Sequence, residues 1–188
     1  MTRDEANSRI LSSQEEHIMT YDEARESIVD GDIVFVAGGT SIWNKLTQLV
    51  TFSPYFHVGI AFWMRDSAYE SRLFMVEAHN GGRRIVSLSS YADRPMTVVA
   101  SEVPYRTYAK ELLDKSGSVK YSIKDFIAIG LTETFKLKIR NASGEVCSEM
   151  VARALNNGNL YLPVLLSPGA LYRRLVDDMR WVVKLSIN

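Results

Sequence analysis

The sequence predicts an α+β protein in which an antiparallel sheet of five to six strands is packed with helices. Short apolar or alternating runs, separated by turn signals, dominate the chain from 33 to 103. Patterns with helical spacing predominate after residue 105. Strands grouped together, with helices before and after them, are typical of α+β architecture. With 188 residues, of which 46% are hydrophobic, the chain can bury one substantial core.

Local patterns predict the individual elements. A helix is expected over 21–29, because Thr20 can cap it and Glu23 follows three residues later; an Asp-Gly-Asp turn then ends it. Residues 33–37 read as a buried strand, and a helix follows the next Gly-Gly pair over about 41–50. The remaining strands are expected at 56–64, 73–78, 84–88, 96–103 and 181–185, with a hairpin turn at 80–82, and further helices at about 105–116, 122–135, 145–157 and 167–178.

The chain divides into a polar arm, residues 1–20, and a single domain, residues 21–188. The first residues lack the apolar core of a secretion signal. No apolar run approaches the roughly 20 residues that span a bilayer. We therefore expect no signal peptide and no transmembrane segment, and a cytoplasmic protein, or a virion-associated one if its origin is viral.

Charge and cysteine content restrict the function classes. Lysine plus arginine number 22, as do aspartate plus glutamate, and this zero net charge disfavours long-range capture of nucleic acid. A basic stretch with Lys136, Lys138 and Arg140 is interpreted as a solvated face. A single cysteine excludes an internal disulfide and thiolate-rich zinc or iron–sulfur sites.

That cysteine, Cys147, begins a predicted helix directly after a Ser-Gly break. A thiol is a poor nucleophile until it loses its proton, and the partial positive charge and free N–H groups of a helix start favour the thiolate. The N–H groups of Cys147 and Ser148 could also donate to a developing oxyanion. The alternative is a buried cysteine that packs as a small apolar residue.

His57 lies in an apolar strand pattern. Alternation puts it on one face with Gly59, while Phe56 and Val58 fall on the other face. A small residue beside a histidine leaves room for another group to approach the ring, as a general base that contacts a thiol requires. The alternative is a core histidine whose ring nitrogens are hydrogen-bonded.

Glu77 stands in a run that otherwise reads as core, where carboxylates are rarely buried without a partner. If its strand pairs with that of His57, Glu77 could accept from the imidazole and fix its tautomer. His79 shares the face of Glu77 and is the alternative orienting group. Glu77 is preferred because a carboxylate only accepts hydrogen bonds. Glu149 is a weaker competitor, better explained by the helix dipole.

The order His, Glu, Cys resembles the circularly permuted branch of the NlpC/P60 papain-like superfamily. It is carried by SPYFHVGI at 53–60, VEA at 76–78 and VCSEMV at 146–151. DGDIVF at 30–35 matches the opening strand of the family. Within that branch, the sequence more closely resembles the group that contains bacterial YiiX/YebB-type proteins and an orthopoxvirus protein. The resemblance covers roughly 28–157 and implies a circularly permuted papain-like fold.

The resemblance implies a function as well. Cys147 would be the nucleophile, His57 the general base and Glu77 the orienting residue of a hydrolase or acyltransferase. The bond attacked would be an amide or ester of a small molecule, peptide or lipid, and the reaction would pass through a thioester without a metal or organic cofactor. The wider superfamily cleaves peptidoglycan peptides, whereas relatives of the permuted branch also act on lipid acyl groups.

Two other functions remain open at this point. A non-catalytic virion or partner-binding protein could keep the fold and dock through residues 1–20 or the tail after Leu160, where Pro163, Leu165 and Leu166 form an apolar stretch. A peptidoglycan endopeptidase outside the cell is disfavoured by the expected lack of a signal peptide.

Overall fold

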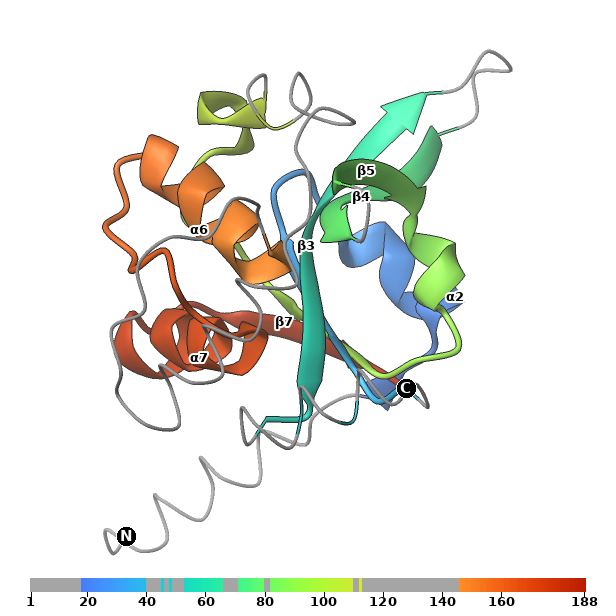
Figure 1. Cartoon of the computed structure of the whole chain (residues 1–188). Helices are drawn as coiled ribbons and strands as arrows, with labels where there is room; N and C mark the ends of the chain where they lie inside the picture. The colour runs from blue at the N-terminus through green and yellow to red at the C-terminus, as the bar shows by residue number, and fades with distance from the viewer. Residues whose placement is uncertain are drawn as a thin grey trace, which may run out of the picture.

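One sheet organises the molecule (Figure 1). The computed structural model describes residues 18–39, 45, 48, 53–65, 71–79, 82–109, 112 and 146–188. Among these residues seven strands are hydrogen-bonded in the order β1-β7-β6-β2-β3-β4-β5. The strands are β1 (Ile18–Met19), β2 (Ile33–Ala37), β3 (Tyr55–Arg65), β4 (Ser71–His79), β5 (Gly82–Ser87), β6 (Met96–Val99) and β7 (Val183–Ile187).

The sheet confirms the predicted α+β class. Strands β2 to β7 pair antiparallel, and the short β1 adds a parallel edge beside β7. Of the stretch expected to be an arm, residues 1–17 lie outside the described residues, while Ile18–Met19 form β1.

The helices predicted to start at 21, 145 and 167 begin at 21, 147 and 168, whereas the short helical segment at 88–91 was not predicted and the one that starts at 105 ends at 107. Thr20 and Glu23 form the expected capping box, in which the Thr20 N–H donates to Glu23 Oε2 at 2.8 Å. The segments are α2 (Tyr21–Ala24), η1 (Arg25–Ser27), η2 (Leu88–Tyr91), η3 (Tyr105–Thr107), α6 (Cys147–Asn157), α7 (Pro168–Arg173) and η4 (Arg174–Asp178). The helix expected at 122–135, the basic stretch near 138 and most of 41–50 lie outside the described residues. None of the described helices is long and apolar enough to cross a membrane.

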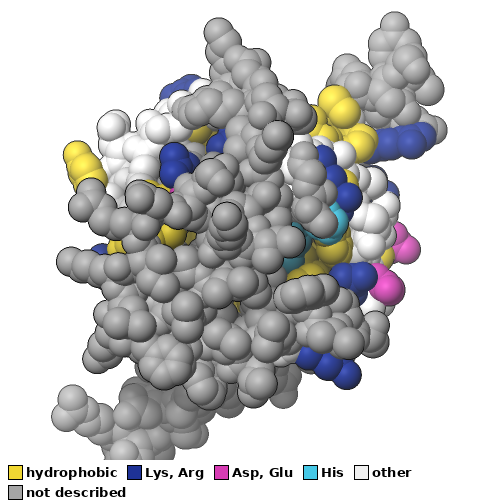
Figure 2. All heavy atoms as spheres, viewed as in Figure 1, with side chains coloured by type: hydrophobic (Ala, Val, Ile, Leu, Met, Phe, Trp, Pro, Cys, Tyr) yellow, Lys and Arg dark blue, Asp and Glu magenta, His cyan; other side chains and the backbone are white. Residues whose placement is uncertain are grey.

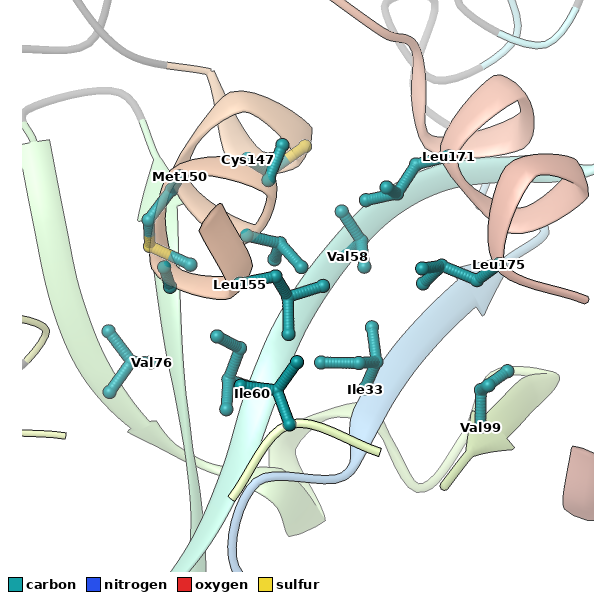
Figure 3. Close-up of a cluster of buried hydrophobic side chains, with 14 of the residues drawn as sticks. Ile33, Val58, Ile60, Val76, Val99, Cys147, Met150, Leu155, Leu171 and Leu175 are labelled. Carbon is teal, nitrogen blue, oxygen red and sulfur yellow. The ribbon is translucent and has the colours of Figure 1, made fainter. Parts of the chain in front are cut away.

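Helices cover both faces of the sheet, α6 and α7 on one and α2 and η2 on the other (Figure 1). We call the two apolar clusters the α6-side core and the α2-side core. The α6-side core includes Ile33, Phe35, Val58, Ile60, Val76, Cys147, Met150, Val151, Leu155, Leu171 and Leu175 (Figure 3). The α2-side core includes Tyr21, Ala24, Val34, Val36, Ala61, Leu73, Met75, Leu88, Tyr91 and Met96.

Much of the tail after Leu160 packs into the α6-side core. Leu171 and Leu175 are fully buried in the α6-side core. Pro163 and Leu165, in the apolar stretch considered for docking, are exposed.

Regular alternation along β3 is broken just before His57. Val58 packs into the α6-side core, whereas Phe56 packs against the α2-side core, although strict alternation predicted one face for both. The reason is a register shift against β2, where His57 pairs with Val36 while Tyr55 pairs with the next β2 residue. Such bulges re-aim side chains and are frequent next to functional sites.

Gly59 allows β3 and β4 to pack closely against each other. We expected its missing side chain to give access to the imidazole of His57. A Cβ at Gly59 would lie 2.5 Å from Met75 Cγ and 2.7 Å from the Val76 carbonyl oxygen. The space is therefore taken by β4, and glycine lets β3 and β4 approach closely.

Substitution Gly59→Ala is expected to lower the free energy of unfolding by about 1–3 kcal/mol, because the added methyl group overpacks the contact between β3 and β4. Urea denaturation of both proteins measures this change. A loss below about 0.5 kcal/mol would mean that β4 can move away without cost.

Candidate active site

Cys147 is the first residue of α6 and lies on the buried face of that helix. The buried apolar positions Cys147, Met150, Val151, Ala154 and Leu155 recur at helical spacing. Figure 3 shows Cys147 at the start of α6, beside Val58 of β3 and Leu171 of α7. The thiol is thus fixed where the sheet, α6 and α7 meet, and its side chain is free of any disulfide.

The first turn of α6 keeps backbone donors beside this thiol. The Met150 N–H donates to the Val146 carbonyl at 2.9 Å and makes the first intrahelical bond. The three preceding N–H groups, from Cys147 to Glu149, have no acceptor within the helix. Val146, at the N-cap position, has no side-chain oxygen to cap them. Oriented N–H groups next to a nucleophile suit a negatively charged oxygen.

His57 is buried near the start of β3 and is hydrogen-bonded to a carboxylate. Its Nε2 lies 2.7 Å from Glu77 Oε2. Because an ionised carboxylate only accepts hydrogen bonds, Nε2 carries the proton of this bond. Nδ1 is then the ring nitrogen left for another partner, and the side chain of Cys147 is close enough to act on the ionisation of His57.

Glu77 has no solvent exposure, and donors surround both of its oxygens. Oε2 accepts from His57 and, at 2.7 Å, from the hydroxyl of Tyr91. Oε1 accepts from Arg84 Nε at 2.7 Å and lies at the same distance from its Nη2. A buried carboxylate is tolerated only when such partners replace water.

These contacts set the ionisation of Glu77. Burial raises the pKa of its carboxyl, because the charged form loses hydration. The hydrogen bond and charge of His57, with the hydrogen bonds of Tyr91 and Arg84, outweigh burial and lower the pKa from 4.5 to about 2. Glu77 is therefore an anion throughout the neutral range.

The pKa of His57 is shifted in the opposite direction, upwards. Burial by itself lowers the pKa of the imidazole, but the charge of Cys147 and its hydrogen bond, together with Glu77, raise it from 6.5 to about 10. The surroundings thus favour an imidazolium between two acidic groups near neutral pH.

The structure brings together the three residues that the sequence singled out, while their catalytic roles stay predictions. Glu77 is the residue hydrogen-bonded to His57, and the competing His79 is an exposed residue at the end of β4. Glu149 pairs with Arg153 at 2.7 Å, as an acidic group in the first turn of a helix often does. Trp43 and Tyr121, which could line a cleft, lie outside the described residues.

Sequence reasoning missed Arg84 and Tyr91. Arg84 begins the strand predicted after the hairpin turn, and it lies directly opposite Glu77 in the sheet. The position of the predicted turn at 80–82 could have indicated this pairing. Once His79 pairs with Gly82, the register of the hairpin places Arg84 opposite Glu77. Tyr91 reaches Glu77 from η2, and no local pattern indicates this.

The described residues do not fit a metal centre. No group of three or more histidine, cysteine or acidic side chains among them is arranged to hold a metal ion. Glu77 is surrounded by donors, and the guanidinium of Arg84 would repel a cation at that carboxylate.

Comparison with known proteins relates the chain to a solved structure. No protein-family model matches the chain, and no curated protein matches it. The chain is similar to the crystal structure of metalloprotein YiiX from Escherichia coli O157:H7, a DUF1105 protein. The sequence identity is 16% and the TM-score 0.44, and the match covers 77% of this chain and 91% of that one. The motifs resembled the group that contains YiiX-type proteins, and the finer assignment to the NlpC/P60 superfamily stays a prediction.

Stability is expected to depend on pH through Glu77 and His57. The pKa of Glu77 is lower in the folded protein, so its charge stabilises the fold above pH 4.5, and this contribution of up to about 3 kcal/mol is lost as pH falls towards 2. The pKa of His57 is higher in the folded protein, so its contribution is complete below pH 6.5 and is lost as pH rises towards 10. Urea denaturation across this range should give greatest stability between the two windows. Glu77→Gln should flatten the acidic limb, and an acidic limb unchanged in that variant would contradict the assignment.

Proposed function

We propose that this chain is a cysteine-dependent hydrolase or acyltransferase acting on an amide or ester bond. The observation that carries the proposal is the continuous series of contacts from Cys147 through His57 to Glu77. Each member has the chemistry that its place requires: a thiol at a helix start, an imidazole with one nitrogen on each neighbour, and an ionised carboxylate.

In the first half of the reaction the Cys147 thiolate attacks the carbonyl carbon of the substrate. A C–S bond forms, and the carbonyl π electrons move to oxygen, where N–H groups of the first turn of α6 stabilise the negative charge. When the oxyanion collapses, the C–N or C–O bond breaks. His57 gives its Nδ1 proton to the departing amine or alcohol, and a thioester on Cys147 remains.

In the second half neutral His57 acts as the base. It takes a proton from water, or from an acceptor amine or alcohol, whose heteroatom attacks the thioester carbonyl. The C–S bond then breaks, the acyl product leaves and the thiolate–imidazolium pair is restored. Glu77 keeps its charge throughout, because its role is to hold the tautomer and orientation of His57.

The charges of the resting site support this cycle. The raised pKa of His57 favours the imidazolium beside Cys147, and in the proposed cycle this cation is the counter-ion of the thiolate. A thiolate is the reactive form of cysteine. The proposal specifies the bond that is cleaved, an amide or ester, and not the molecule that contains it. A peptidoglycan peptide is one such substrate.

Alkylation of Cys147 tests the proposal directly, because no other thiol contributes. At pH 6.5, iodoacetamide should modify the wild-type protein at least about tenfold faster than His57→Ala, in which the thiolate loses its counter-ion. The rate of carboxamidomethylation is measured by mass spectrometry.

His79→Ala is the matched control, since it removes an exposed histidine from the neighbouring strand. Its rate should equal that of the wild type. Equally slow alkylation of wild type and His57→Ala would make Cys147 a core residue and would remove the basis of the hydrolase proposal.

Acyl transfer to Cys147 gives a second prediction. An activated ester such as p-nitrophenyl acetate should release a burst of nitrophenol and leave one acetyl group on Cys147, because thioester formation precedes hydrolysis. Cys147→Ala should abolish the burst. Intact-mass analysis after acid quenching detects the adduct, and a burst that persists in Cys147→Ala would place the acylation elsewhere.

A further inference from the structure

One short segment, β5 followed by η2, supplies both additional partners of Glu77. Arg84 pairs with Glu77 across the β4–β5 ladder, and Tyr91 is the last residue of η2. The proposed reaction uses neither side chain on substrate. Both nevertheless hold a carboxylate that is inaccessible to water.

Tyr91 contacts both Glu77 and His57. Its hydroxyl donates to the same Oε2 atom that accepts from His57. Its ring lies 5.9 Å from the imidazole, with an interplanar angle of 29°. The Arg94 guanidinium lies 5.5 Å from the Tyr91 ring and 5.7 Å from the ring of Phe56. The two aromatic rings are thereby held in place beside the imidazole.

Arg84 balances the charges of the site. In the proposed cycle a thiolate, an imidazolium and the Glu77 carboxylate together carry one net negative charge, which the Arg84 guanidinium offsets. Its side chain is 47% exposed, whereas that of Glu77 is fully buried. Figure 2 shows Lys or Arg side chains next to the visible histidines, with hydrophobic side chains beside them. The positive charge on Glu77 Oε1 therefore reaches the site from the solvent side.

We propose that Tyr91 and Arg84 are positioning residues of this site, which hold Glu77 ionised and aim its Oε2 at His57 Nε2. This inference rests on the proposed function in assigning a role to His57. A carboxylate accepts about four hydrogen bonds, and these two residues and His57 supply them. Loss of either partner would leave part of a buried charge unsatisfied and would let Glu77 turn away from His57 Nε2.

The experiment compares Tyr91→Phe, which keeps the ring and removes the hydroxyl, with Arg84→Gln, which removes the charge. The first readout is the titration of the His57 ring nitrogens by NMR. In Tyr91→Phe the midpoint should fall by about one pH unit, because the hydrogen bond that aims Glu77 Oε2 at His57 is lost. In Arg84→Gln it should rise by a similar amount, because a positive charge near the imidazolium is lost. The second readout is the rate of Cys147 alkylation at pH 6.5, which should fall about fivefold.

Each variant has a matched control away from the site. Tyr161→Phe changes a tyrosine that is 89% exposed. Arg174→Gln breaks a pair with Asp178 in which the arginine is 44% exposed. Neither control should move the His57 midpoint. Arg84→Lys keeps the positive charge and should restore most of the shift, which provides a test even if Arg84→Gln fails to fold.

An unchanged His57 midpoint in folded Tyr91→Phe would overturn the role of Tyr91. For Arg84, the overturning results are an unchanged midpoint in folded Arg84→Gln relative to Arg174→Gln, or a shift of a full pH unit in Arg84→Lys, which keeps the charge. Failure of the hydrolase proposal looks different. In that case alkylation of Cys147 is independent of His57, whereas the His57 midpoint still reports on how Glu77 is held.

Discussion

A carboxylate without solvent exposure constrains the whole site. Glu77 can remain charged in the sheet only if fixed donors replace its water shell. These donors come from three places: β3 brings His57, β5 brings Arg84 and η2 brings Tyr91. The antiparallel order β3-β4-β5 makes this possible, because it sets Glu77 on the strand between the other two. The sheet therefore does more than support the site, since its pairing fixes which charges meet.

His57 connects the two layers of the protein. Cys147 belongs to the α6-side core, whereas Tyr91 belongs to the α2-side core. His57 interacts with side chains from both, because Cys147 acts on its ionisation and its ring lies against that of Tyr91. The extra residue in β3, Phe56, lies where this connection is made. A bulge at that point changes the direction of the strand, which regular alternation would not allow.

Much of this arrangement follows from the sequence, and the remainder has physical reasons. His57 and Glu77 stand out because titratable residues are rare in apolar strands, and Cys147 because a helix begins there. The pairing of Arg84 with Glu77 could have been predicted from the hairpin register. Tyr91 could not, since its contact depends on how η2 folds back over the sheet. The bulge also escaped prediction, because it depends on pairing with β2, which the sequence of β3 alone does not encode.

The energetic cost of this site bears on the choice between catalysis and docking. Buried ion pairs are weak stabilisers, and apolar residues of similar size often replace them without loss of stability. A protein that served only as a docking scaffold would gain nothing from an imidazolium and an anion in its interior, and its contact surfaces would lie outside, for example at Pro163 and Leu165. Charges kept at such a cost beside a thiol are explained most directly by chemistry that uses them.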